Sequence, residues 1–248
     1  MPGKRVAIVQ SSYVPWKGYF DMINEVDEFI LFDDRQFTRR DWRSRNRVKT
    51  AAGPRWLTIP VKVKGNYHQR IDETVVADPQ WAKSHWRTLV QAYSAAPCFA
   101  TYRDVFESCY LGIDTDRLSQ INRTFIETVC GALDIGTKLS WSTEYAGVGD
   151  RSGRLASICV AAGASVYLSG PTARSYIQPE AFEEAGVELQ YMDYTGYGEY
   201  PQIHPPFDHQ VSILDLLFNT GEAAADHMLT FRGDQKRQGA AWGSGAER

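Results

Sequence analysis

The sequence predicts an α/β fold, a doubly wound and mostly parallel Rossmann-like sheet with a helical insertion. Two apolar β-branched runs, residues 6–9 and 29–32, flank an amphipathic stretch in the first 35 residues. Alternating helix-like and strand-like patterns return over residues 154–191, and three helical patterns fill the region between about 80 and 136. Strand, helix and strand in succession is typical of a parallel βαβ unit.

The first βαβ unit, over residues 6–32, has the clearest sequence pattern. Both of its strands are apolar throughout rather than alternating, as expected when helices cover both faces of a sheet. Between them, Trp16, Tyr19, Phe20 and Ile23 recur at steps of three and four residues, which predicts a helix over residues 15–26 with Pro15 in its first turn.

The middle of the chain begins with a third predicted strand, residues 55–63, which Pro60 restricts to a sheet edge or a bulge. Three amphipathic helices follow, centred on residues 81–93, 102–110 and 118–133. They form the predicted helical insertion.

The second half supplies the remaining elements. We expect strands at 139–141, 165–169 and 187–191, and helices at 154–162, 179–185 and 211–221, the last capped by Ser212. Together these elements predict one α/β domain over residues 1–231 with its insertion at about 80–136, followed by a flexible C-terminal tail, residues 232–248.

Composition narrows the class of protein. The chain has 248 residues, 43 % hydrophobic and 23 % charged, which is typical of a globular protein. No apolar run approaches the roughly 20 residues that span a bilayer. The sequence shows no signal-peptide core, and its four cysteines form no CxxC pair and suit buried reduced thiols. We therefore expect a cytoplasmic protein without a membrane partner.

Positive charge is concentrated at the start of the chain. The net charge is −3, yet residues 1–70 carry 14 basic and seven acidic residues. Six arginines and one lysine lie between Arg35 and Lys49, and Arg39, Arg43 and Arg47 would share one face of a helix. The planar guanidinium group matches phosphate and carboxylate, so the segment predicts an anion-binding site. A solvated charged surface is the alternative.

Residues 10–20 lie where the first strand gives way to a helix, a place where α/β proteins bind phosphate. Ser11 and Ser12 would cap this helix and donate hydrogen bonds to an anion. The segment matches neither GxGxxG nor a Walker loop. A capped turn with an aromatic core face is the alternative interpretation.

Two later segments could complete the same cleft. Residues 167–177 follow another strand and carry Ser, Gly, Thr and Arg side chains, while tyrosines in 193–202 would either stack on a base or pack as a loop. Asp33 and Asp34 end the second strand and would orient the arginines, hold a metal or form a turn. We predict no metal site.

Histidine suits a general base because it titrates near neutral pH. His209, His85 and His68 are the candidates, each with a structural or exposed histidine as the alternative. The predicted catalytic residues are Asp33 and His209. The predicted substrate- and phosphate-binding residues are Gln10, Ser11, Ser12, Tyr13, Trp16, Lys17, Gln36, Arg39, Arg43, Arg45, Asn46, Arg47, Ser169, Gly170, Thr172 and Tyr176.

Five segments of the chain resemble the WbqC-like family, and the resemblance runs from about residue 5 to 221. They are QSSYVPWKGYFD (10–21), DDRQFTRRDWRSRNR (33–47), WLTIPV (56–61), YLSGP (167–171) and FDHQVSILDLLFN (207–219). Many members carry His-Gln-Pro where this chain has Val9-Gln10-Ser11, so a catalytic histidine there does not carry over. The opening also resembles that of adenylyl-transferring enzymes, without their histidine pair.

The resemblance implies a biosynthetic transferase for sugars, O-antigen or secondary metabolites that moves an acyl or aminoacyl group to an amino group. From the basic segment we also expect that the donor or substrate bears phosphate. It would be a nucleotide, a nucleotide-linked sugar or the acceptor end of an aminoacyl-tRNA. Two alternatives remain. One is a nucleotidyltransferase with Mg²⁺ held by Asp33 and Asp34. The other is a non-catalytic anion-binding module.

Overall fold

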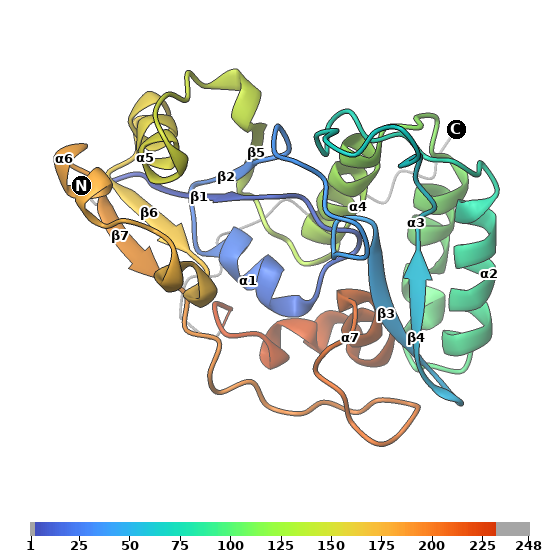
Figure 1. Ribbon diagram of the computed structural model, residues 1–248. Helices are drawn as coiled ribbons and strands as arrows, with labels where there is room; N and C mark the ends of the chain where they lie inside the picture. The colour runs from blue at the N-terminus through green and yellow to red at the C-terminus, as the bar shows by residue number, and fades with distance from the viewer. Residues whose placement is uncertain (1–2, 232–248) are drawn as a thin grey trace, which may run out of the picture.

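A computed structural model describes residues 3–231, and its centre is a five-stranded sheet in which every neighbouring pair of strands is parallel (Figure 1). The strand order is β5-β2-β1-β6-β7. The strands are β1 (Arg5–Val9), β2 (Glu28–Leu31), β5 (Lys138–Trp141), β6 (Val166–Ser169) and β7 (Glu188–Tyr191). The predicted Rossmann-like α/β fold is confirmed.

Helices cover both faces of this sheet. Helix α1 (Lys17–Asn24) packs on one face, whereas α5 (Arg151–Ala161) and α6 (Glu180–Glu184) pack on the other. Successive side chains of β1 accordingly point into two different cores: Ala7 joins the α1 side, while Val6 and Ile8 join the α5 side. This explains why the strand is apolar throughout instead of alternating.

The order of the strands reverses beside β1. The chain passes from β1 outward to β2 and β5 and then returns to the other side of β1 to form β6 and β7. In open α/β sheets, the crevice at the carboxyl ends of the strands beside such a reversal is where ligands bind. The loop after β1, residues 10–16, lies at this place.

The basic segment adopts a hairpin, not a helix. Strand β3 (Arg45–Thr50) pairs antiparallel with β4 (Gly53–Thr58) in a separate two-stranded sheet. The predicted shared helical face of Arg39, Arg43 and Arg47 is therefore wrong, because residues 39–44 form turns and Arg47 lies within β3. The prediction that Pro60 limits the next strand holds: β4 ends at Thr58 and has one strand neighbour.

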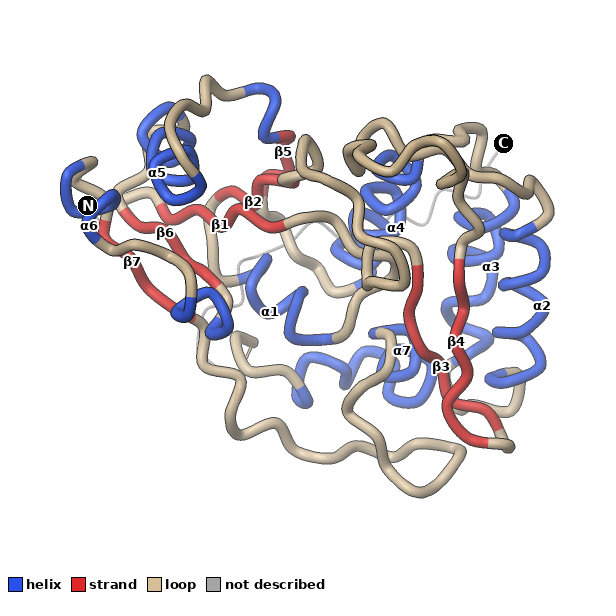
Figure 2. Tube along the Cα trace, viewed as in Figure 1, coloured by secondary structure: helices blue, strands red, loops and turns tan. Residues whose placement is uncertain are grey.

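The predicted helical insertion is present as α2 (Trp81–Tyr93), α3 (Phe99–Leu111) and α4 (Leu118–Ala132). Figures 1 and 2 show the β3–β4 hairpin with α2 and α3 on one side of it and the parallel sheet on the other, and α7 (Ile213–Thr220) lies beside β3. Phe218 of α7 contacts Tyr93, Phe99 and Phe106 and so joins α7 to the insertion.

Several smaller expectations can be compared with the structure. Ser212 caps α7 by accepting the Leu214 N–H, as predicted. Ser11 and Ser12 do not cap α1, because its N-cap residue is Trp16 and its helix begins two residues after Pro15. All four cysteines are free. The predicted tail, residues 232–248, lies outside the described residues.

A buried carboxylate on α1 connects the two ends of the described chain. Asp21 is fully buried, and its Oδ1 accepts the N–H groups of Leu229 and Thr230 and the Thr230 hydroxyl, over 2.8–3.0 Å. Its Oδ2 accepts the Tyr197 hydroxyl. One side chain thus fixes residues 229–230 against the helix that follows the β1 loop.

Candidate functional site

A pocket of about 440 Å³ lies at the carboxyl end of β1, beside the reversal of strand order. Three segments far apart in the sequence line it: the end of β1 with the start of α1, the turn before β3, and the loop before α7. Its lining residues are Val9, Ser12, Pro15, Trp16, Tyr19, Trp42, Arg43, Asn46, His209 and Gln210. This central pocket is the candidate site.

Buried hydrogen bonds fix the β1 loop from both sides. The Ser11 N–H donates to Asp33 Oδ1 over 2.7 Å, and Asn122 Nδ2 donates to Ser11 Oγ over 3.0 Å. On the other side, Asn46 Nδ2 donates to the carbonyl oxygens of Tyr13 and Val14. Ser11 and Asn46 therefore shape the loop instead of offering free polar groups.

Two donors at the central pocket keep unused capacity. Ser12 is 5 % exposed, and its hydroxyl makes no hydrogen bond within residues 3–231. Arg43 donates from Nη1 to the Gln10 carbonyl over 3.1 Å, which fixes its guanidinium group, but its buried Nε has no hydrogen-bond partner and lies 3.9 Å from Asp41. Arg43 thus brings a fixed guanidinium group with unused hydrogen-bonding capacity to the wall of the pocket, and guanidinium groups bind anions well.

His209 lines the central pocket and is its candidate general base. Its imidazole packs against Phe207 with ring centroids 4.5 Å apart. Partial burial and the nearby positive charge of Lys17 lower the pKa of His209, and Glu199 and Asp208 oppose this shift. The imidazole is therefore mainly neutral at pH 7 and able to accept a proton.

Aromatic side chains form much of the remaining wall. Trp16, Tyr19 and Trp42 line the central pocket, and Trp16 is itself held edge-on by Tyr194 at 5.1 Å. The Tyr19 hydroxyl donates to the Gln10 carbonyl over 3.2 Å, so this ring is fixed as well. Rigid rings around a few polar groups suit a ligand with a planar or apolar part and an anionic part.

The other predicted catalytic residue, Asp33, does not line the central pocket. It is 2 % exposed, its Oδ2 accepts the Ser119 hydroxyl, and it borders a separate hollow of about 210 Å³. Asp34 at the same hollow accepts hydrogen bonds from Ser142 and Arg154. Both carboxylates thus have protein partners, and no group of three or more potential metal ligands gathers within residues 3–231.

Two predicted binding residues near the β1 loop lie inside the protein. Tyr13 is fully buried and its hydroxyl bonds to His85 Nδ1 and to the Tyr110 hydroxyl, so Tyr13 and His85 belong to the helical core. Lys17 is 4 % exposed, donates to the His227 carbonyl and lies over the Tyr197 ring. Lys17 acts on the central pocket only through its charge.

The predicted residues at the end of β6 and directly after it are also absent from the lining of the central pocket. These are Ser169, Gly170, Thr172 and Tyr176, the last stacked under Arg151 at 3.7 Å. Arg45 and Arg47 lie on the hairpin outside it, and Arg39 is exposed. The loop that carries His209 takes the place that the sequence suggested for residues 167–177.

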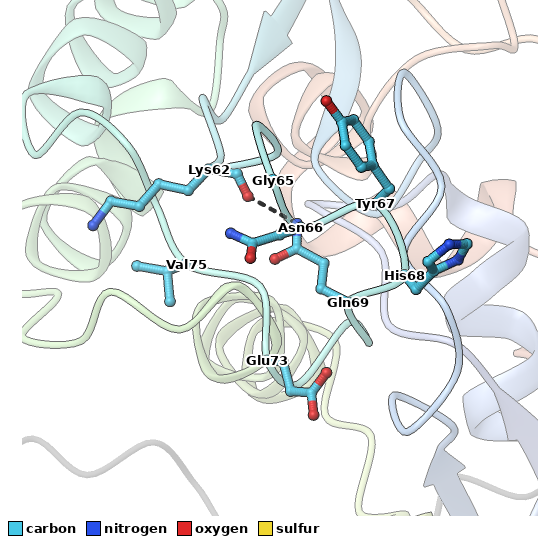
Figure 3. Close-up of a pocket in the computed structure, with 8 residues that line it drawn as sticks. All are labelled: Lys62, Gly65, Asn66, Tyr67, His68, Gln69, Glu73 and Val75. Atoms are coloured by element: carbon cyan, nitrogen blue, oxygen red, sulfur yellow. Dashed lines mark hydrogen bonds between the residues drawn. The ribbon is translucent and has the colours of Figure 1, made fainter.

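A larger surface hollow, about 570 Å³, lies elsewhere on the loop between β4 and α2 (Figure 3). Gln69 donates to the Lys62 carbonyl across it over 2.8 Å, and the 68 % exposed Tyr67 stands at its rim. Predicted residue Gln36 donates to the Tyr67 carbonyl and so belongs to this region. His68, one of the three candidate general bases, lines this hollow, but none of the predicted catalytic, substrate-binding or phosphate-binding residues does.

Sequence reasoning missed five lining residues of the central pocket, which are Val9, Pro15, Tyr19, Trp42 and Gln210. Gln210 accepts a hydrogen bond from Arg47 Nη2 at its Oε1 and from Arg47 Nε at its carbonyl, and these bonds attach the His209 loop to β3. Trp42 lies among the arginines of residues 35–49, and the sequence alone does not show that its side chain is exposed. Within residues 3–231, no helix has both the length and the apolar character needed to cross a bilayer.

Comparison with known proteins agrees with the motifs. The model of the WbqC-like protein family matches residues 10–227, which include all three segments of the central pocket. The chain is also 48 % identical over 225 residues to the uncharacterized protein Rv1507c of Mycobacterium tuberculosis, covering 91 % of this chain and 97 % of that protein. No solved structure matches. The chain belongs to the WbqC-like protein family.

Proposed function

We propose that the protein is a transferase that binds a phosphate-bearing donor or substrate in the central pocket and moves an acyl or aminoacyl group to an amino group. The observation that carries the proposal is a pocket whose wall combines the Ser12 hydroxyl and the Arg43 guanidinium group, both with unused hydrogen-bonding capacity, with a histidine whose pKa is lowered. The family resemblance supports the reaction class.

Binding follows from the wall of the pocket. Arg43 and Ser12 hold the anionic group, while the rings of Trp16, Tyr19 and Trp42 contact the planar or apolar part. Holding two reactants in the productive geometry contributes on the order of 7–11 kcal/mol to lowering the barrier. Positioning of the two reactants is therefore the main contribution of this site to the reaction rate.

His209 serves as the general base in this proposal. The amine attacks the carbonyl carbon of the donor, the new C–N bond forms, and the C–O bond to the leaving group breaks. His209 takes the proton from the attacking nitrogen and returns it to the leaving oxygen, so the imidazole ends the cycle neutral. Asp33 contributes to the fold of the loop, since both of its oxygens accept hydrogen bonds there.

Ligand titration tests the proposal. Calorimetry with adenosine nucleotides and nucleotide-linked sugars should give binding that Arg43→Ala weakens at least tenfold, since charge-assisted hydrogen bonds contribute about 1.5–3 kcal/mol. Arg39→Ala is the matched control, because Arg39 is exposed and does not line the pocket. Equal affinity of the Arg43→Ala variant for every phosphate ligand would remove the basis of the proposal.

The alternatives make different predictions. A nucleotidyltransferase would release pyrophosphate from a nucleoside triphosphate and lose this activity in chelator, whereas the partners of Asp33 and Asp34 support structural roles for both. A non-catalytic module needs no pocket of this size. The four free cysteines favour a reducing compartment, and we place the reaction in the cytoplasm.

A further inference from the structure

The β3–β4 hairpin and the turn before it expose two tryptophans side by side. Trp42 is 43 % exposed and Trp56 is 42 % exposed, and their ring centroids lie 5.5 Å apart with the planes at 41°. Indole rings are mostly buried in folded proteins. A neighbouring pair that remains accessible is typical of a surface that binds another molecule.

Arginines extend this aromatic surface. Arg47 lies directly opposite Trp56 in the hairpin, and Arg45, two residues earlier, lies on the same face. The Arg45 Cζ is 4.1 Å from the centroid of the Trp56 ring and the Arg47 Cζ is 5.7 Å away. We refer to Trp42, Arg45, Arg47 and Trp56 as the Trp56 platform.

The charge of this platform is only partly balanced. Arg47 lies 3.7 Å from Asp208, but the Arg45 side chain forms no ion pair or hydrogen bond within residues 3–231, and its buried Nε has no partner. The exposed Arg39 and Arg40 beside it form no ion pair among the described residues either. The surface therefore carries several positive charges that a polyanion would neutralise.

The Trp56 platform is continuous with the central pocket. Trp42 belongs to both, and Arg43 of the pocket lies between Trp42 and Arg45 in the chain. A ligand that fills the pocket and continues past Trp42 would place its next planar group against Trp56 and its next anionic group against Arg45.

We infer that the Trp56 platform binds a single-stranded polynucleotide, whose terminal nucleotide enters the central pocket. The inference rests on the proposed function, because it names the phosphate-bearing substrate as a nucleotide chain. Bases stack on exposed indole rings, and guanidinium groups fix the phosphates between them. An acidic protein segment would use the arginines, but it would leave the paired indole rings without a function.

Fluorescence anisotropy with labelled six-nucleotide RNA and DNA strands tests the inference, with AMP and polyglutamate as competitors. The strands should bind at least tenfold more tightly than AMP. Trp56→Ala should weaken strand binding about tenfold or more, since stacking of one base corresponds to such a change, and Trp56→Phe should restore part of it. Arg45→Ala should reduce the salt slope by about 0.7.

Tyr67→Ala and Arg87→Ala are the matched controls, because both residues are exposed, lie outside the platform and should leave strand binding unchanged. AMP affinity equal to that of the strands would overturn the inference while the proposed function stands. Polyglutamate binding as tightly as the strands, with Trp56→Ala unaffected, would assign the surface to an acidic protein and overturn it as well. Strand binding that depends on Trp56 but is insensitive to Arg43→Ala would support the platform and contradict the proposed pocket.

Discussion

Asn46 of β3 donates to the carbonyl of Val14 over 2.7 Å, and Val14 has a backbone φ of 35°. This left-handed conformation is unfavourable for a β-branched residue, and such strain persists only where surrounding contacts enforce it. The hairpin therefore sets the conformation of the β1 loop. Strained backbone gathers at binding and catalytic sites, and this loop lines the central pocket.

Removing the Asn46 amide should release this loop. Asn46→Ala leaves two buried carbonyls, those of Tyr13 and Val14, without their donor, so we expect a loss of about 2–3 kcal/mol in the free energy of unfolding. Urea denaturation measures it. Asn46→Asp keeps the oxygen that accepts the Arg47 N–H but lacks both donors, and it should be no more stable than Asn46→Ala. A stable Asn46→Asp variant would refute the role of the donors.

The buried carboxyl group of Asp33 should give the free energy of unfolding an unusual dependence on pH. Burial raises the pKa of Asp33, and hydrogen bonds from Ser119 and Ser11 oppose the shift. The folded protein thus binds this proton more tightly than the unfolded chain does, and the free energy of unfolding falls as pH rises above the ordinary value of 3.8. Asp33→Asn should abolish this decline.

The same variant separates structural from catalytic roles. An asparagine at position 33 still accepts the Ser11 N–H and donates to Ser119, so transfer activity should stay within about threefold if His209 is the base. Asp33→Ala should lose about 2 kcal/mol of stability, because the Ser11 N–H is left unpaired. A transfer rate that collapses in a well-folded Asp33→Asn variant would instead make Asp33 the base.

Glu28, at the start of β2, should determine how the free energy of unfolding falls at acidic pH. Burial alone would raise the pKa of Glu28, but hydrogen bonds from Lys4, Ser140, Tyr145 and Lys138 lower it to about 2. Stability from this group is complete above its ordinary value of 4.5 and is lost as pH falls toward 2. In Glu28→Gln, the free energy of unfolding should change less between those pH values. Glu25→Gln, at a half-exposed residue nearby, should leave this pH dependence unchanged.

His209 should control chemistry more than binding. His209→Gln should lower the transfer rate by about 10²–10⁴-fold while leaving the affinity for the phosphate ligand nearly unchanged. Because the pKa of His209 is lowered, the rate should stay constant from pH 8 down to about its ordinary 6.5 and fall only at more acidic pH. Lys17→Gln should raise the pKa of His209, which proton NMR measures. The exposed His68 is the matched control: loss of activity in His68→Gln would contradict this assignment.

The sequence predicted the fold well because the helices and the strands of the parallel sheet are marked by local periodicity. The segment 6–32 has apolar strands around an amphipathic helix, and these patterns need no tertiary contact to be recognised. Strand β4 was predicted within residues 55–63, but its partner β3 was missed because arginines at 39, 43 and 47 fit a helical spacing. Arg43, Arg45 and Arg47 also alternate with Ser44 and Asn46, a period of two that indicated the strand.

The site was harder to predict than the fold. Tyr13 and Lys17 follow a strand end, as binding residues often do. The helical insertion buries Tyr13, however, and the C-terminal part of the chain buries Lys17. His209 reaches the pocket through a loop held by Gln210 and Arg47, a contact between residues 163 positions apart. No local pattern encodes such a contact.

The carboxylate of Asp21 has a consequence for the order of events during synthesis. Its Oδ1 partners, Leu229 and Thr230, lie 208 and 209 residues after Asp21 in the chain and are translated correspondingly late. A nascent chain still on the ribosome carries α1 with this buried charge unmatched. The final hydrogen bonds of α1, the helix that follows the β1 loop, therefore form only after translation has passed residue 230.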